Sequence, residues 1–514
     1  MGPWSDSGWL WGLASDEGPM VSADHVWHDP TMPFLEGRGT SVWLIVLTLA
    51  LGACTVGPDY RRPAVPNPAT FRGQPPGDSP LSLGDLAWWR LFEDETLQQL
   101  INEGIRENYD LRIAAARILQ ARAQVTISRS FQFPELNNSG SAIYSHIQGE
   151  RTIFQPQNQF APIASLDLSF ELDLWGRFRR STEAARADLL ASVDFRRFVL
   201  STLVTDVASA YFNLRSLDDE LEVSRRTVVT REENLRLVKM REAGGVAGMI
   251  DVRQAEILVA QAAEAVVDTE RLIEQTENAL SVLIGHPPEA MPRGRPLLQQ
   301  ITLPAVPTGV PSALFERRPD IRQAEDQLAA ATARIGVAKS DFYPRVFLTG
   351  AAAGGALHID GSWIGPQGLF NIGPSIHLPI FNMGRTQAGV DSAEAQAQVA
   401  VEQYRQTIIQ AFREVADALV EHRKRREFRV QQEALAVAAG DASRLSNIRY
   451  KGGVTSYLEV LDSERQYFDA ELGLVRSSRD ELLAVVRLYR ALGGGWQEEQ
   501  GTQAASSTGE REKK

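Results

Sequence analysis

The chain has 514 residues, a formal net charge of −12 and a sequence pI near 5.3. A balance this acidic argues against a nucleic-acid partner and against a polybasic membrane patch. The single cysteine excludes an intrachain disulfide, and 43% hydrophobic residues are enough for a large buried surface. The chain carries no nucleophile elbow, phosphate loop or paired metal-ligand spacing, so an enzyme is the weakest interpretation and no metal or cofactor is expected.

The N-terminal residues contain a candidate export signal. Residues 41–51 form an apolar run, too short to span a bilayer as a helix but typical of a signal-peptide core. The next residues complete the sequence LGAC, which resembles a bacterial lipobox and implies a lipidated Cys54 as the mature N-terminus. A cleaved secretory peptide with an incidental cysteine is the alternative. We expect residues 32–53 to be a lipoprotein signal peptide, and residues 1–31 to be a misassigned start or unstructured.

The segment after the cysteine is rich in proline. Seven prolines lie between positions 58 and 80, which prevents helix formation and predicts that residues 54–85 form an extended tether. A helical region follows from about Leu86. Asp94 is placed to cap a helix that continues to about Asn108.

The remaining chain repeats itself at an interval of 208 residues. Gly-Gly-Val occurs at 244–246 and 452–454, Gly-Arg at 176–177 and 384–385, and closing glycines at 285 and 493. Each half also contains a predicted helix that begins at an aspartate and ends before a proline 24 residues later, at Asp110–Pro134 and Asp320–Pro344. These intervals predict an internal duplication, with repeats at 86–295 and 311–495 joined by a proline-rich linker at 296–310.

Each repeat contains a segment in which hydrophobic and polar residues alternate with a period of two. This pattern predicts two strands per repeat, at about 135–148 and 163–174 and at about 345–358 and 369–380. The strand length suits either a membrane β-barrel wall or a soluble, half-buried sheet. Because four strands cannot close a barrel and open edges are not tolerated in lipid, a membrane location requires several chains to share one barrel.

Long proline-free helices follow each pair of strands. They predict helical hairpins at about 177–285 and 384–493, turned by the double glycines. From Val454 to Tyr489 mostly apolar residues recur at steps of four and three, which is the stripe of a coiled coil. The polar, low-complexity tail at 496–514 is expected to be disordered.

Together these features resemble the outer-membrane factor family, the TolC-like exit ducts, and in particular its NodT-type lipoprotein branch. The specific stretches are VGPDYRRP (56–63), WWRLFEDETLQQLI (88–101), RRPDI (317–321), YKGGVTSYLEVLD (450–462) and the first glycine turn. The resemblance implies a mainly α-helical homotrimer. Long coiled-coil hairpins form an α-barrel, and each chain gives four strands to a shared twelve-strand β-barrel in the outer membrane of a Gram-negative bacterium.

The same resemblance implies a passive, gated channel without catalytic activity or a cofactor. Its partners would be a periplasmic adaptor and an inner-membrane pump, commonly of the resistance-nodulation-division type. Outer-membrane lipid surrounds the strands. Two alternatives stay open: a type I protein-secretion exit duct, and a structural coiled-coil lipoprotein of the envelope.

The resemblance also assigns candidate functional residues to the hairpin tips. Glu459 and Asp462 match the periplasmic aperture carboxylates, which form acidic rings in a trimer. The sequence alone favours a solvated helix face for these two acids, and the resemblance reverses that preference. Asp251 and Tyr450 match residues that hold the entrance shut. The family's second link uses an arginine where this chain has Thr455. The adaptor-docking surface matches the two glycine turns: Gly244, Gly245, Val246, Gly452, Gly453 and Val454.

Overall fold

The computed structural model describes residues 55–65, 67–74, 82–146, 148, 158–300 and 309–496. The predicted lipidation site Cys54, the signal peptide at 32–53, residues 1–31 and the tail from residue 497 lie outside the described residues. No helix in the described part of the chain is both long enough and apolar enough to cross a membrane.

The internal duplication is visible in the helix bounds. Each repeat has one helix of 67 residues followed by one of 35, and the two pairs are offset by 208 positions. The long helices begin after Gly176 and Gly384, which both adopt positive φ. The helices are α2 (Trp88–Leu91), α3 (Glu95–Glu107), α4 (Tyr109–Ser130), α5 (Arg177–Ala243), α6 (Met249–Leu283), α7 (Leu314–Arg317), α8 (Pro319–Ser340), α9 (Arg385–Lys451) and α10 (Tyr457–Ala491), with short 3-10 turns at Leu83–Asp85, Leu297–Gln300 and Pro311–Ala313.

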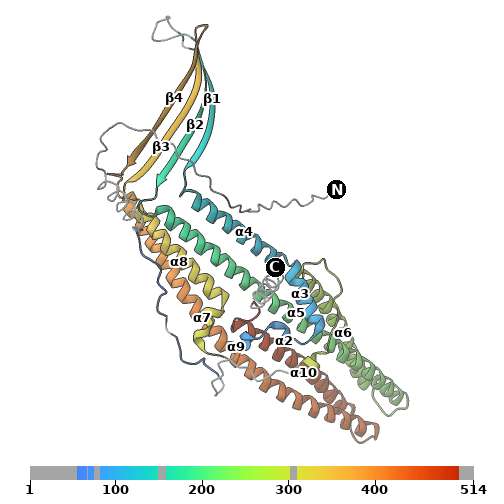
Figure 1. The fold of residues 1–514 in the computed structure, drawn as a ribbon. Coiled ribbons are helices and arrows are strands. Elements are labelled where there is room, and N and C mark those ends of the chain that lie inside the picture. Colours follow the sequence, from blue (N-terminus) through green and yellow to red (C-terminus); the bar gives the residue numbers. More distant parts are fainter. Residues whose placement is uncertain are drawn as a thin grey trace, which may run out of the picture. The chain divides into compact units, whose positions relative to one another are not determined.

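The four strands form one antiparallel sheet in the order β1-β2-β3-β4. The strands are β1 (Glu135–His146), β2 (Asn158–Leu172), β3 (Arg345–Ile359) and β4 (Ser362–His377). Figure 1 shows the sheet at one end of the helices and the tips of the two hairpins, α5–α6 and α9–α10, at the other.

Two strands are displaced from their predicted bounds. β2 begins at Asn158 instead of 163, and β4 spans Ser362–His377 instead of 369–380. Ladder pairing extends both strands through residues that do not alternate, as in the pairs of β3 with Gln159 and with Trp363. β4 ends before Pro379, which cannot donate to a ladder.

The outer strands of the sheet have a partner on one side only within the chain, because β1 pairs with β2 alone and β4 with β3 alone. Both outer strands also present large apolar side chains that are exposed among the described residues. These are Leu136, Ile143 and Tyr144 of β1, and Trp363, Leu369, Phe370, Ile372 and Ile376 of β4.

The main core lies where α3, α5, α8, α9 and α10 pack together. Asp94 caps α3 as predicted, since its side chain accepts from the amides of Thr96 and Leu97. The same carboxylate accepts from the Tyr211 hydroxyl at 2.7 Å. Burial raises the pKa of the Tyr211 hydroxyl, so it remains a hydrogen-bond donor. One charged side chain therefore fixes α3 to α5 inside an apolar core.

The described residues of the proline-rich segment, 55–65 and 67–74, form no helix or strand, and they lie against the helices. The Val56 amide donates to the Trp175 carbonyl at 3.0 Å, directly before α5. A Cβ atom on Gly57 would lie 2.4 Å from the Gly336 Cα atom, so α8 and this segment meet where neither has a side chain. Arg62 donates to Glu325 and to Glu316, which both lie in the second repeat.

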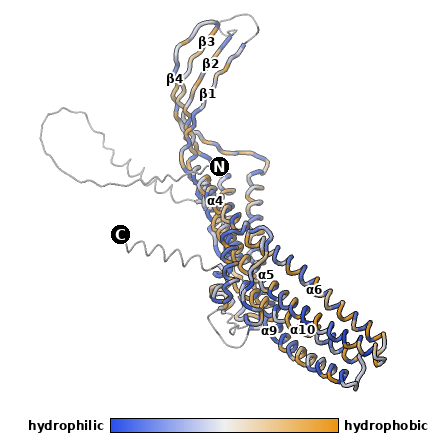
Figure 2. The backbone as a smooth tube through the Cα atoms, turned by 90° about the vertical axis from the view of Figure 1, so that its right-hand side faces the viewer, coloured by the Kyte–Doolittle hydropathy of each residue, from blue (hydrophilic) through white to orange (hydrophobic). Residues whose placement is uncertain are grey.

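Burial departs from the sequence pattern in three places. In the predicted stripe from Val454 to Tyr489, Val454 and Leu458 are exposed, and burial is continuous only farther from the tip, where α5 covers α10. Trp496, the first residue of the predicted tail, is buried and lies 5.1 Å from the Arg197 guanidinium. Leu297 of the predicted linker is also buried, because it inserts into the main core. Figure 2 shows hydrophobic and hydrophilic residues mixed along every long helix.

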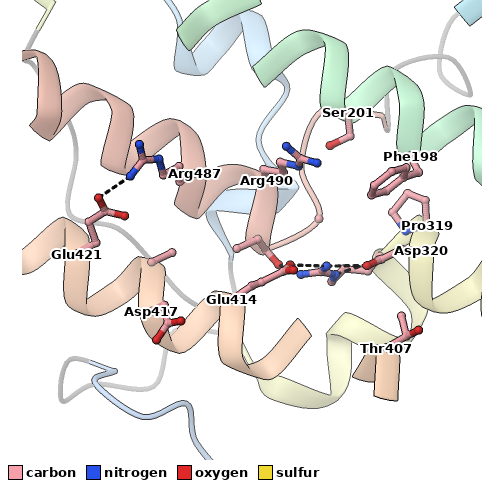
Figure 3. Close-up of a pocket in the computed structure, with 14 residues that line it drawn as sticks. Phe198, Ser201, Pro319, Asp320, Thr407, Glu414, Asp417, Glu421, Arg487 and Arg490 are labelled. Atoms are coloured by element: carbon pink, nitrogen blue, oxygen red, sulfur yellow. Dashed lines mark hydrogen bonds and ion pairs between the residues drawn. The ribbon is translucent and has the colours of Figure 1, made fainter. Parts of the chain in front are cut away.

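A cavity of about 640 Å³ lies between α5, α8, α9 and α10 (Figure 3). Its central group is Arg318 of the RRPDI stretch, whose guanidinium donates to the Ala491 carbonyl at 3.0 Å. The same guanidinium pairs with Asp320 at 2.6 Å and with Glu414 at 2.7 Å. Because these charges satisfy one another, Arg318 forms a structural junction between α8, α9 and α10 of the second repeat.

Replacing Arg318 with alanine should lower the free energy of unfolding by about 2–4 kcal/mol, since two carboxylates and a helix-terminal carbonyl lose their partner. Urea unfolding of the detergent-solubilised protein, followed by circular dichroism, measures this loss. Arg413→Ala on exposed α9 is the control, because its ion pair with Asp417 is long at 3.9 Å. Equal stability losses in the two variants would contradict a structural role for Arg318.

Candidate functional site

The tips of the two hairpins are built alike from their glycine turns. Gly244 ends α5 and Gly452 ends α9, and the next glycine in each turn has a φ near +73° or +74°. The Val246 amide donates to the Arg241 carbonyl at 2.9 Å, and Val454 does the same to Arg449 at 3.0 Å. Nothing lies within 4 Å of a Cβ atom placed on Gly245 or Gly453, so backbone conformation alone requires glycine there.

Each turn presents an apolar side chain outward. Val246 and Val454 are exposed, and Met249 and Ile250 beside the first turn are exposed as well. Exposed apolar residues at a helix turn are unfavourable in water unless a partner covers them. The tips therefore have the character of a contact surface.

Glu459 and Asp462 lie in the first turns of α10 on one exposed face, three residues apart. The Glu459 carboxylate accepts from the Thr455 hydroxyl and lies 3.6 Å from the Arg449 guanidinium. Asp462 accepts from the Gln466 amide at 2.7 Å and lies 3.5 Å from Arg465. Asp462 is thus oriented by residues of its own helix, and Glu459 by the turn before α10 and by α9, while both carboxylates remain open to solvent.

Arg449 belongs to the same site, although the sequence motifs did not predict it. Thr455 stands where the resemblance led us to expect an arginine; its hydroxyl donates to Glu459, and Arg449 supplies a guanidinium to the same carboxylate. The sequence held a signal, because Arg449 and Arg241 occupy matching places in the two tips. The second tip therefore keeps an arginine–carboxylate contact, formed from a different helix.

Tyr450 is buried between the two tips. Its ring packs against Tyr457 at 5.4 Å and beneath the Arg241 guanidinium at 4.4 Å, while Arg241 also donates to the Tyr450 carbonyl at 2.7 Å. The Tyr450 hydroxyl has no hydrogen-bond partner within the described residues. Asp251 accepts from the Gly248 amide at 3.2 Å and so caps α6. Tyr450 and Asp251 thus lie in the same region without a hydrogen bond between them.

The pKa of Tyr450 reflects this arrangement. Burial raises the pKa of the hydroxyl, the nearby Arg241 charge lowers it, and Asp251 raises it further. The net direction is upward, so the phenol stays protonated and remains available as a donor. An acceptor that reaches the hydroxyl would gain a hydrogen bond that the isolated chain lacks.

A second buried polar cluster links the hairpins above the tips, and sequence reasoning did not find it. Glu464 of α10 accepts from Asn447 of α9 at 3.1 Å and from Asn234 of α5. Arg231 of α5 donates to the Leu258 carbonyl of α6 at 2.8 Å. The cluster therefore connects all four hairpin helices.

This cluster is only partly satisfied. Within the described residues, one Glu464 oxygen and two Arg231 nitrogens have no hydrogen-bond partner, although all three atoms are buried. The Arg231 guanidinium lies 4.9 Å from the centre of the Phe468 ring. Burial raises the pKa of Glu464, while Asn447 and Arg231 oppose that shift. The burial of Glu464 could not be predicted from the apolar stripe of α10, because the stripe includes the next residue, Arg465, and not Glu464.

The described residues contain no group of three or more histidine, cysteine, aspartate or glutamate side chains arranged to hold a metal ion. The polar clusters of the hairpins pair their carboxylates with arginine and asparagine. They are suited to holding helices together and to presenting charge.

Comparison with known proteins identifies relatives of this architecture. The family model described as "Outer membrane efflux protein" matches the chain twice, at residues 100–286 and 310–494, once in each repeat. The chain is 36% identical over 473 residues to the toluene efflux pump outer membrane protein TtgC of Pseudomonas putida, covering 89% of this chain and 96% of that protein. It is 33% identical to the cation efflux system protein CusC of Escherichia coli, covering 88% and 98%.

Solved structures of outer-membrane channels resemble this chain in fold as well. The outer-membrane channel OprN superposes with a TM-score of 0.77 at 32% identity, covering 86% of this chain and 100% of that chain. The open-state outer membrane channel MtrE of Neisseria gonorrhoeae gives a TM-score of 0.77 at 33% identity, covering 86% and 99%.

Changing Glu464 to glutamine should remove a pH dependence from the hairpin tips. The raised pKa means that the folded protein binds this proton more tightly than the unfolded chain. Local stability is therefore highest at acid pH and falls as pH rises from the ordinary value of 4.5 through the raised pKa. Hydrogen exchange of residues 230–250 and 447–465 at pH 5 and pH 8, corrected for intrinsic rates, measures the difference.

The matched control for this measurement is Glu433→Gln, an exposed acid on α9. It should keep the wild-type pH dependence. If the Glu464 variant keeps the same dependence, the cluster does not control the stability of the tips.

Proposed function

Because the chain belongs to the outer membrane efflux protein family, and is an exit channel in the outer membrane, we propose that its gate and its adaptor-docking surface both lie at the hairpin tips. The observation that carries this proposal is a cluster at the tip end of α5, α6, α9 and α10. It comprises exposed carboxylates, exposed apolar turns and a buried tyrosine whose hydroxyl has no hydrogen-bond partner among the described residues. The family is one of transport channels and not a class of enzymes.

Glu459 and Asp462 are the proposed aperture residues. Threefold repetition of the chain places two rings of three carboxylates around the axis of the channel. Their orientation by Thr455 and Gln466 supports this role, because it holds the acids at fixed positions on the helix. Rings of acidic side chains attract cations and set the charge preference of a pore.

Tyr450 and Asp251 are the proposed latch. The buried hydroxyl of Tyr450 has no partner within the described part of the chain, which supports a bond formed when tips adjust or copies assemble. Arg449, lying near Glu459, takes the place of the arginine that the family carries at position 455. Opening then requires breaking contacts of the second hairpin.

The adaptor is proposed to bind the two glycine turns, Gly244–Val246 and Gly452–Val454. The exposure of both valines supports this surface. The inner-membrane pump is proposed to be of the resistance-nodulation-division type. The relatives include a toluene efflux and a cation efflux component, so we propose that the channel conducts small molecules of differing chemistry and that the pump selects them. The relatives' efflux names favour this function over type I protein secretion.

Lipidation of Cys54 is also proposed. The neighbouring Thr55 lies against Gly176, where the chain passes from β2 into α5, and the Val56 amide bonds to Trp175. An acyl chain attached one residue earlier would therefore begin beside the end of the sheet that adjoins the helices. This position supports an anchor in the leaflet nearest the periplasm.

Changing both Glu459 and Asp462 to alanine should raise the single-channel conductance severalfold and reduce cation preference. The reason is that the narrowest region loses both bulk and negative charge. Planar-bilayer recordings under a salt gradient measure both quantities. Asp441→Ala, at an exposed acid of α9 above the tip, is the control and should behave like the wild type.

Two results would contradict this proposal in different ways. Unchanged conductance and selectivity in the double variant would remove Glu459 and Asp462 from the aperture. An absence of conductance in every variant would contradict the channel itself.

A further inference from the structure

One of the joints between the two repeats of a chain is formed where α5 packs against α10. The ion pairs across this joint are Glu220–Arg476 at 2.9 Å and Asp206–Arg490 at 3.9 Å. Nearer the tip, Arg226 pairs with Glu471 in the opposite sense. The joint is well covered, since Glu220 is 4% exposed and Val475 of α10 is 9% exposed.

The duplication gives every residue of this joint an equivalent residue 208 positions away. The equivalents of α5 and α10 are α9 and α6, and these two helices do not pack against each other within the chain. Phe428, the equivalent of Glu220, is 52% exposed, and Val267, the equivalent of Val475, is 67% exposed. One chain therefore carries two halves of a second joint, both uncovered.

The two uncovered halves carry opposite charge. Residues 264–277 of α6 include five acidic side chains and one basic, whereas residues 421–429 of α9 include five basic side chains and two acidic. Arg425 and Arg429 are already paired with Asp480 and Glu481 of α10. The other three cations, Arg423, Lys424 and Arg426, are exposed on α9, and Lys424 pairs with Glu427 of its own helix at 2.6 Å. On α6, Asp268 likewise pairs with Arg271 of its own helix at 2.6 Å.

The register of the covered joint predicts which residues meet in the uncovered one. In the covered joint the helices are antiparallel and position 220 lies opposite position 476. The residue equivalent to 220 is Phe428, 208 positions later, and the residue equivalent to 476 is Asp268, 208 positions earlier. Phe428 is therefore expected opposite Asp268 of a second copy, and the turn with Arg423 and Lys424 opposite the turn with Glu274. Cations and aromatic carbon on one helix thus face carboxylates on the other.

We propose that α9 of one copy packs against α6 of the next through this surface, in a joint whose polarity is reversed from that of the α5–α10 joint at the same level. The α9–α6 joint comprises Arg423, Lys424 and Phe428 on α9, and Val267, Asp268 and Glu274 on α6. The proposal rests on the ring assembly of the proposed channel and adds the side chains that determine its order.

The reversal makes incorrect pairings unfavourable. If α6 replaced α10 against α5, Asp268 would lie opposite Glu220. If α10 replaced α6 against α9, Arg476 would take the place of Asp268 opposite Phe428, so a cation would replace the carboxylate that faces α9. Repulsion disfavours the first arrangement and the loss of this carboxylate disfavours the second, so the repeats of successive copies alternate around the ring.

Charge reversal tests the joint. The α6 variant Asp268→Lys/Glu274→Lys should lower the trimer-to-monomer ratio by about tenfold in native mass spectrometry, because three joints lose attraction and gain repulsion. The α9 variant Arg423→Glu/Lys424→Glu should do the same. Combining all four changes in one chain restores complementary charge, so the ratio should return close to that of the wild type.

The matched control is Glu433→Lys/Asp441→Lys, two exposed acids of α9 outside the joint. It should leave the ratio unchanged. A second measurement does not depend on charge: Phe428→Cys combined with Asp268→Cys should give covalently linked oligomers under mild oxidation, while either single change should not.

Two results would overturn the proposal: a combined variant as defective as its parts, or the absence of covalent links. Charge variants that keep their trimers but no longer bind an adaptor would assign the surface to that partner instead. Bilayer conductance of the same preparations separates this outcome from failure of the channel. Conducting wild-type trimers that are insensitive to these charges would refute only the joint.

Discussion

The unpaired edges of β1 and β4 are the constraint on which the rest of the architecture depends. A backbone amide or carbonyl left unsatisfied in hydrocarbon costs several kcal/mol, so a four-stranded sheet with two free edges is stable in a bilayer only when other copies pair with it. The fold is that of channels in which three chains share one barrel. Closing the sheet at one end fixes the threefold axis for the helices at the other.

The internal duplication turns this threefold axis into a nearly sixfold ring of hairpins. In a nearly symmetric ring every hairpin needs the same helix lengths, which explains why α5 equals α9 in length and α6 equals α10. Equivalent helices nevertheless meet different neighbours. The sequence separates them through side chains: Glu220 where α5 is covered, and Phe428 where α9 is open. The tips diverge as well, with Asp462 in one and Gln254 in the other.

Much of this fold could be predicted from the sequence, since the information lies in spacing. Glycine turns, prolines and the 208-residue interval locate the hairpins because these residues act through the backbone. Strand bounds were less predictable, because ladder pairing with β3 extends β2 and β4 past their alternating segments. The buried Glu464 and the contact of Arg449 with Glu459 could not be predicted, since both depend on which helix lies opposite.

Polar groups are satisfied very differently along the length of the hairpins. Near the main core, Arg318 and Asp94 have all their charge engaged by carboxylates, hydroxyls and backbone groups. Toward the tips, Glu464, Arg231 and Tyr450 bury four atoms without a partner in the described chain, whereas near the main core Thr202 and Trp496 bury one each. Each such atom costs about 1–3 kcal/mol, so the tip region is held by a smaller net energy than the core. A rearrangement of the tips can recover that energy by hydrating or pairing these atoms, while the satisfied junction around Arg318 keeps the sheet and the upper helices in place. The gate can therefore move without loosening the channel that it closes.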